Sequence, residues 1–236
     1  MEKLRTRRIL EYLRKRKSCT LAELMAKFNV SSATIHRDVE ELARRDAVER
    51  VRGGLVYNET APAPQNSSNF SERVVANRQG KCAAARKALT VVREGDIIFL
   101  DSSTTVYELA LLLRESPLEH LTIVTNSIAV TQNFRKYPPQ WVLIALGGNY
   151  DPQLNSTLGA AALEQLGRFN LTRAFVSAFG IDDKNVTTNH ERQAEIVHRV
   201  LASAEKRYLL VDKSKFGRTG LYRLSARGGF DAIFSG

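Results

Sequence analysis

The chain has 236 residues, of which 43% are hydrophobic and 25% charged, so it is long enough for a small and a medium globular domain. No apolar run approaches the length of a membrane-spanning helix, and the basic N-terminus lacks the apolar core of a signal peptide. Cys19 and Cys82 lack the spacing of metal ligands, and we expect free thiols in a cytoplasmic protein. The sequence therefore predicts no membrane partner, no metal and no cofactor.

The formal net charge is +10, and most of the excess lies in residues 1–57. That segment has 14 Lys and Arg against 8 Asp and Glu, whereas the other 179 residues have 21 against 17. A local excess of positive charge indicates a module that binds a polyanion. A solvated basic face without a partner explains the charge equally well, so the motifs must decide.

Three amphipathic helices are expected in the basic segment. Residues 4–16 place leucines and an isoleucine roughly on one face. Thr20-Leu-Ala-Glu23 is a capping-box pattern that opens a second helix. Ser31 is a good N-cap for a third helix, which runs to about Asp46 and buries an apolar stripe at i, i+4 and i+7.

Two short helices joined by a tight turn form a helix-turn-helix, whose second helix reaches base edges in the major groove of double-stranded DNA. The following VERVRGGLVY predicts a hairpin that turns at Gly53-Gly54, a wing with arginines for the phosphate backbone. The expected DNA-binding residues are Ser31, Ser32, Ala33, Thr34, His36, Arg37, Arg50 and Arg52. A three-helix domain that binds another protein is the alternative, but caps, spacing, charge and wing together favour DNA.

Residues 58–70 combine two prolines with small polar residues and predict a linker between a DNA-binding domain at 1–57 and a second domain at 71–236. After a helical stretch from Ser71 to Val92, short apolar runs alternate with helical patterns, which predicts an α/β fold with a mostly parallel sheet covered on both faces. The expected strands are 97–100, 121–124, 141–146, 174–177, 208–211 and 231–234, and the expected helices are 106–114, 128–136, 160–169 and 192–206.

Small polar residues follow five of these strands. Ligands of open α/β sheets bind beyond the carboxyl ends of the strands, so these loops predict a ligand pocket. Hydroxyls and amides at the helix start Ser102–Thr105 suit an anion, and Lys215 adds a positive charge. Asp101 and Asn126 can bind sugar hydroxyls, so we expect a small phosphorylated sugar or polyol. Each loop taken alone is also typical of an ordinary helix cap.

The motif TIHRDVEEL at residues 34–42, followed by Arg52-Gly53-Gly54, resembles the N-terminal signature of the DeoR family of bacterial transcription regulators. Six later stretches resemble its sensor domain, which is similar in fold to ribose-5-phosphate isomerase: LDSSTT, VTNS, LGGNYDPQLNSTLGAAA, FGID, VTTNHERQAE and DKSKFG. The resemblance implies a dimeric or larger repressor of a carbohydrate operon that a phosphorylated sugar releases from its operator. The effector-binding residues that it implies are Lys81, Asp101, Ser102, Ser103, Thr104, Thr105, Asn126, Gly147, Gly148, Glu195, Asp212 and Lys215.

The chain departs from the family pattern at a few positions. His36 stands where the family usually has arginine, Ser103 where glycine is common, and Val197 where lysine is frequent. Relatives usually continue through another short helix and strand beyond the position of Gly236. These departures bear on base preference, on the phosphate contacts and on the edge of the sheet.

An isomerase-like enzyme with a fused nucleic-acid-binding module is the alternative function. Its candidate bases are Asp101, Asp182 and Glu195, which equally suit binding to sugar hydroxyls or helix capping. The histidines at 120, 190 and 198 form no recognisable nucleophile–base pair or metal motif. The fused DNA-reading module favours sensing over turnover, and no enzymatic activity is expected.

Overall fold

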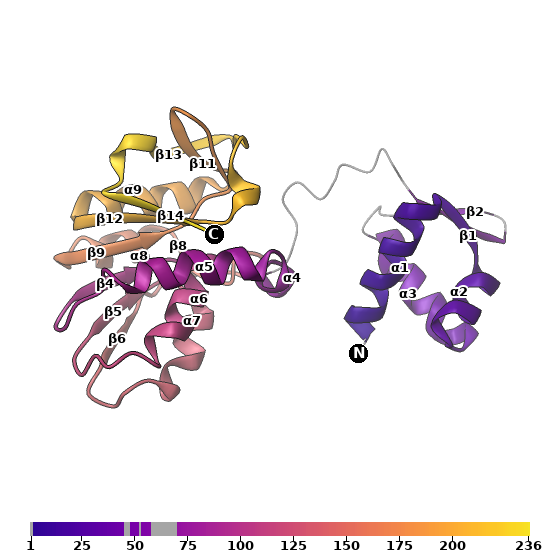
Figure 1. Cartoon of the computed structure of the whole chain (residues 1–236), viewed down its shortest axis with the longest axis horizontal. Helices are drawn as coiled ribbons and strands as arrows, with labels where there is room; N and C mark the ends of the chain where they lie inside the picture. Colours follow the sequence, from indigo (N-terminus) through magenta and orange to yellow (C-terminus); the bar gives the residue numbers. More distant parts are fainter. Residues whose placement is uncertain (1, 45–47, 52, 58–69) are drawn as a thin grey trace. The chain divides into compact units, whose positions relative to one another are not determined.

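The computed structural model describes residues 2–44, 48–51, 53–57 and 70–236, and the chain divides into two compact units, 1–65 and 66–236 (Figure 1). Of the expected linker, residues 58–69 lie outside the described residues, and Phe70 begins a helix. None of the helices in the described ranges has the length and apolarity needed to cross a bilayer.

The described part of the N-terminal unit contains the three expected helices and a winged hairpin (Figure 1). Its strands form an antiparallel sheet in the order β1-β3-β2, which confirms the helix-turn-helix with its wing. No sequence pattern predicted β1, a strand of three residues that pairs with β3. The elements are α1 (Glu2–Arg16), β1 (Ser18–Thr20), α2 (Leu21–Phe28), α3 (Ser32–Arg44), β2 (Val48–Val51) and β3 (Gly54–Tyr57).

Local signals set the ends of these helices. The capping box that opens α2 is present: the Glu23 amide donates to the Thr20 hydroxyl at 3.2 Å, and the Thr20 amide donates to the Glu23 carboxylate at 2.8 Å. Asn29, in the left-handed conformation with φ 50°, ends the helix. The apolar stripe of α3 is buried as expected, together with residues of α1, α2 and the wing; the core members include Ile9, Leu13, Leu24, Ile35, Val39, Leu42, Val48 and Leu55.

The C-terminal unit is built on a six-stranded parallel sheet in the order β14-β12-β9-β4-β5-β6. This confirms the parallel α/β fold, and each of the six strands overlaps one of the expected segments. The strands are β4 (Ile97–Leu100), β5 (Thr122–Thr125), β6 (Val142–Ala145), β9 (Leu171–Val176), β12 (Ala204–Val211) and β14 (Ala232–Ser235). The helices are α4 (Phe70–Val75), α5 (Arg78–Leu89), α6 (Thr104–Leu113), α7 (Ile128–Asn133) with the 3-10 turn η1 (Phe134–Lys136), α8 (Ala160–Leu166) and α9 (Glu191–Ser203).

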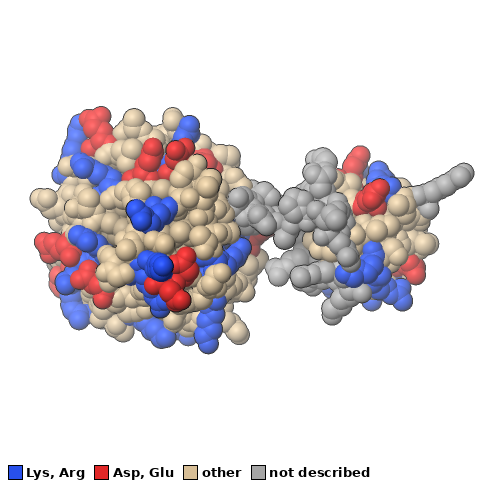
Figure 2. All heavy atoms as spheres, turned by 90° about the horizontal axis from the view of Figure 1, so that it is seen from above, with Lys and Arg blue, Asp and Glu red and all other residues tan. Residues whose placement is uncertain are grey.

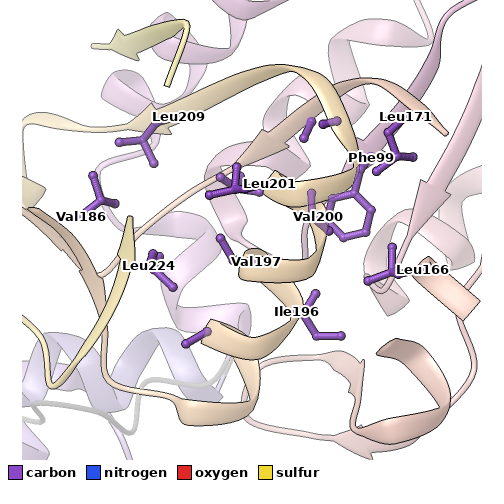
Figure 3. Packing of buried hydrophobic residues seen from close by; sticks show 14 of the residues in the cluster. Phe99, Leu166, Leu171, Val186, Ile196, Val197, Val200, Leu201, Leu209 and Leu224 are labelled. Carbon is purple, nitrogen blue, oxygen red and sulfur yellow. The ribbon is translucent and has the colours of Figure 1, made fainter. Parts of the chain in front are cut away.

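Helices cover both faces of this sheet, because successive strand residues point to opposite sides. Ile98 and Leu100 of β4 pack in one cluster with α5, α6 and α7. Phe99 packs in the opposite cluster, with α8 and α9 (Figure 3). In that cluster α9 contributes Ile196, Val197, Val200 and Leu201 among its buried residues. The periodic apolar runs therefore placed the two core layers correctly.

Smaller strand pairs surround the main sheet, and the sequence analysis did not expect them. The pair β7 (Asn149–Asp151) and β8 (Ser156–Leu158) forms a hairpin after β6. A three-stranded sheet joins β10 (Gly180–Ile181), β11 (Asn185–Thr188) and β13 (Tyr222–Ala226). The 3-10 turns are η2 (Lys213–Lys215) and η3 (Arg227–Gly229). These strands are short and mostly polar, so no period-two apolar pattern announces them.

Candidate functional site

The start of α3 presents an exposed surface, as a recognition helix requires. Ser32, Ala33, His36 and Arg37 are exposed, and Thr34 is half-buried. The Thr34 amide donates to the exposed Ser31 hydroxyl at 3.4 Å, so Ser31 caps the helix as expected. The first turn of α3 thus holds small side chains beside one exposed arginine.

A buried ion pair fixes α3 against α1. The Asp38 carboxylate is 1% exposed and accepts from Arg5 through both oxygens, from Nε at 2.5 Å and from Nη2 at 3.0 Å. Two parallel bonds between a guanidinium and a carboxylate fix orientation as well as distance. Asp38 therefore holds α3 against α1, a role that no local sequence pattern predicted.

The wing brings one of the expected arginines to α3. Arg50 of β2 is exposed, and its Nη2 lies 3.2 Å from Nδ1 of His36. Arg52 lies outside the described residues. Figure 2 shows Lys and Arg side chains grouped on part of the visible face of the N-terminal unit, whereas on the C-terminal unit the two signs of charge are interspersed.

In the C-terminal unit, most of the expected effector residues lie at the carboxyl ends of β4, β5 and β12. Because parallel strands end at one edge of the sheet, these residues come together there although more than a hundred positions separate them in sequence. Unlike polar residues of ordinary loops, they are buried. The buried members are Lys81, Asp101, Ser102, Ser103, Thr104, Thr105, Asn126 and Asp212.

Asp101 joins two strand ends. Its Oδ1 accepts from the Ser103 amide at 2.8 Å, and its Oδ2 accepts from the Ser177 amide at 2.8 Å. Burial raises the pKa of the Asp101 carboxyl, and these hydrogen bonds oppose that shift. Both oxygens are engaged in holding the backbone after β4 and β9. This geometry favours a structural role over that of a general base.

Three cationic side chains approach this edge from different elements: Arg73 of α4, Lys81 of α5 and Lys215 of η2. Burial lowers the pKa of Lys81 to about 8, although Asp212 lies near enough to oppose the shift. Burial also lowers the pKa of Lys215 and of Arg73, and the positive charge of Arg73 contributes to the shifts of both lysines. Cations held close together at a partly buried edge favour the binding of an anion among them.

Two buried acceptor atoms at the same edge have no hydrogen-bond partner within the described residues: Oδ1 of Asn126 and Oδ2 of Asp212. Each residue is only 2% exposed. Their other polar atoms are engaged, since Asn126 Nδ2 donates to the Ser156 hydroxyl at 2.8 Å and Asp212 Oδ1 accepts from the Ser214 amide at 2.9 Å. Buried acceptors are almost always paired, so these two indicate a ligand that supplies hydroxyl donors.

Sequence reasoning missed Arg73 and Asn77, which the structure adds to this site. The Arg73 guanidinium donates to the Gln153 carbonyl at 3.2 Å, and the Arg73 carbonyl accepts from the ammonium of Lys81. Asn77 donates to Asp212 Oδ1 at 3.3 Å and to the Ser214 hydroxyl at 3.0 Å. Both residues lie in a basic helical stretch before the first strand, where no local pattern marks a binding residue.

Three other expected effector residues lie outside the group of buried residues at this edge. Glu195 is exposed on α9, whose opposite side is buried in the core (Figure 3). The Gly147 amide already donates to the Gln165 side chain at 2.9 Å. Gly148 has φ 133°, and a Cβ there would lie 2.5 Å from the Leu158 carbonyl oxygen, so the close approach of β8 requires this glycine. The structure thus gives the two glycines backbone roles.

Two family models match the chain in succession. The model described as the DeoR-like helix-turn-helix domain matches residues 5–61, and that described as the DeoR C terminal sensor domain matches residues 76–236. Together they span both compact units.

Several curated regulators are similar to the chain along nearly its whole length. The HTH-type transcriptional regulator IolR of Bacillus subtilis is 32% identical over 94% of this chain and 86% of that protein. The L-fucose operon activator of Haemophilus influenzae is 30% identical over 96% of this chain and 89% of that protein. The lactose phosphotransferase system repressor of Lactococcus lactis is 27% identical over 92% of this chain and 84% of that protein.

Solved structures are similar at a lower level. A D-ribose-5-phosphate isomerase in complex with phospho-erythronic acid matches 58% of this chain and 52% of its own, with 17% identity and a TM-score of 0.43. The translation initiation factor eIF-2B of Pyrococcus horikoshii matches 99% of this chain and 82% of its own, with 15% identity and a TM-score of 0.46. At these TM-scores the assignment rests on the family models and the curated relatives.

Proposed function

The chain belongs to the DeoR family of transcriptional regulators, and on that premise we propose that it represses a carbohydrate-use operon and is released from its operator by a phosphorylated sugar. The observation that carries the effector half is the convergence of Arg73, Lys81 and Lys215 beside two unpaired buried acceptors. Cations suit the phosphate, and the acceptors suit sugar hydroxyls.

The charges in the proposed site indicate which residues bind the phosphate and which bind the hydroxyl groups of the ligand. The start of α6, with Ser103 as its N-cap and the helix dipole behind it, favours the negative end of a ligand. Asn126 and Asp212 then take its hydroxyl groups. A neutral sugar satisfies the acceptors but offers no negative charge to the cations, so we expect a phosphorylated ligand to bind more tightly.

Release from DNA requires that the effector favour one conformation over another. The element best placed to respond is α4, because it follows residues 58–69, which lead from the DNA-binding unit, and it carries Arg73. Lys81 holds the Arg73 carbonyl, and the ring of Phe70 packs edge-on against Tyr107 at 5.8 Å. An anion that draws Arg73 and Lys81 toward itself therefore changes the contacts that hold α4.

Repression needs two DNA-reading units on one operator, since paired contacts raise affinity and match repeated half-sites. We therefore assign the working form to a homo-oligomer, a dimer or a tetramer. The relatives include proteins named as repressors and one named as an activator, so gene expression with and without the chain is the direct test of the sign of regulation.

The deciding experiment is a thermal-shift screen of the purified full chain against sugar phosphates and the same sugars without phosphate, followed by operator release in gel shifts. A ligand that binds only the folded protein raises the melting temperature. We expect a phosphorylated sugar to stabilise the chain and to release it from DNA, while its neutral parent does neither. Stabilisation by the neutral sugar alone, or product formed over many turnovers in NMR spectra, contradicts the proposal.

A further inference from the structure

We propose that His36 and Arg50 form one recognition unit, in which the imidazole of α3 positions the wing guanidinium to read the acceptor-rich edge of a guanine. This inference rests on the DNA-binding function and adds a specific base preference to it. It starts from a single contact between two exposed side chains of different elements, with Arg50 Nη2 lying 3.2 Å from His36 Nδ1.

Strand alternation directs Arg50 toward α3. In β2, Val48 is buried in the core with α3, whereas Glu49 and Val51 are exposed. Side chains two residues apart lie on the same face of a strand, so Arg50 shares the α3-facing side with Val48. The packing of the wing therefore places Arg50 on the side of β2 that faces the recognition helix, within reach of His36.

The contact defines the role of one ring atom of the histidine. A guanidinium has only donors, so Nδ1 of His36 is the acceptor in this contact, and the tautomer that makes it carries its hydrogen on Nε2. The outward atoms of the pair are then Nε2–H and the remaining guanidinium N–H groups, all of them donors. Arg37, the next residue on the exposed surface, adds further donors.

A surface made only of donors selects among base edges. In the major groove guanine presents two acceptors, N7 and O6, whereas cytosine and adenine each present an amino donor. The pair therefore matches guanine and meets a donor when a cytosine takes its place. His36 also restricts the rotamers of Arg50 before DNA arrives, which reduces the ordering cost of binding.

The test is a double-mutant cycle on duplexes that the wild-type full chain selects from a random library. We expect His36→Ala and Arg50→Ala each to weaken binding roughly tenfold and to remove the preference for the same G·C pair. The double variant should bind about as weakly as either single variant, since both remove one unit. His36→Asn should restore part of the preference, because its amide oxygen can accept from the guanidinium.

Glu49→Gln is the matched control, since Glu49 is exposed on the other face of the same strand and should keep the base preference. If the double variant loses roughly a hundredfold in affinity, the product of the two single losses, the two residues act independently and the proposal is overturned. It is also overturned if the two single variants lose their preference at different base pairs. A loss of affinity that is uniform across sequences and reduces only the salt dependence of binding has the same consequence. If the wild-type chain enriches no duplex at all, the failure lies in the DNA-binding function itself.

Discussion

The two units handle their polar groups in opposite ways. In the N-terminal unit the described contact residues are exposed except the half-buried Thr34, and the buried charge Asp38 is paired with Arg5. In the C-terminal unit most of the expected contact residues are buried, and two acceptor atoms remain without a partner among the described residues. The difference fits the proposed partners, since a DNA duplex is reached from a convex exposed helix, whereas a small metabolite must be surrounded.

The two units therefore differ in the substitutions that they tolerate. In the N-terminal unit, the exposed residues of the DNA-binding surface can be replaced while the scaffold beneath them stays folded. The proposed effector site contains groups that are costly to bury, which is typical of residues that serve binding more than folding.

Asp38→Asn should destabilise the N-terminal unit by about 3 kcal/mol, because it leaves the Arg5 guanidinium without its buried charged partner. Denaturant unfolding followed by circular dichroism measures the change, and DNA binding should fall with it. Glu40→Gln, on the exposed side of the same helix, is the control and should alter stability little. Equal stability of the two variants would show that the ion pair does not hold α3.

Lys215→Ala should reduce the affinity for the effector by about 1.5–3 kcal/mol, which is the contribution of a hydrogen bond to a charged group. Operator binding without effector should stay unchanged, so release should need far more ligand. Titration calorimetry and gel shifts with the sugar phosphate from the screen measure both properties. Lys184→Ala, in a turn between β10 and β11, removes an exposed lysine as a control. Normal release by the Lys215 variant would exclude that residue from the site.

Arg37→Ala should weaken operator binding by ~1–3 kcal/mol and relax the preference at one base pair, if the arginine touches a base. A uniform loss across sequences, together with a smaller salt slope, would instead indicate a phosphate contact. Arg86→Ala, which removes an exposed arginine from α5 of the other unit, should leave DNA binding unchanged. Fluorescence anisotropy at two salt concentrations separates these outcomes.

The affinity for the effector should fall as pH rises through about 8, because burial lowers the pKa of Lys81 to about 8 and the neutral amine no longer attracts phosphate. The loss is at most tenfold per pH unit. The unliganded unit should show the opposite trend: its unfolded chain binds that proton more tightly, so stability rises between pH 8 and the ordinary pKa of 10.5. Lys81→Met should weaken both pH dependences. If both persist in full in this variant, groups other than Lys81 cause them.

Local patterns were sufficient wherever a residue's environment follows from its neighbours in sequence. The capping box at Thr20, the apolar stripe of α3 and the glycine turn of the wing each specify an element directly. The alternation of apolar runs and helical patterns likewise predicted the parallel sheet, because a strand covered on both faces must be apolar throughout. Polar residues just after those runs indicated the edge of the sheet at which the structure buries most of the expected effector residues.

Sequence patterns were enough to predict a DNA-binding unit followed by a parallel α/β sensor unit, with polar loops at the ends of its strands. Which groups meet in space became clear from the folded chain alone. The fold brought Arg73 and Asn77, from the start of the C-terminal unit, to the loop after β12. It also paired His36 with the wing and left Glu195 on an exposed face. The physical reason is that burial and pairing depend on contacts between distant segments, and no local propensity encodes those contacts.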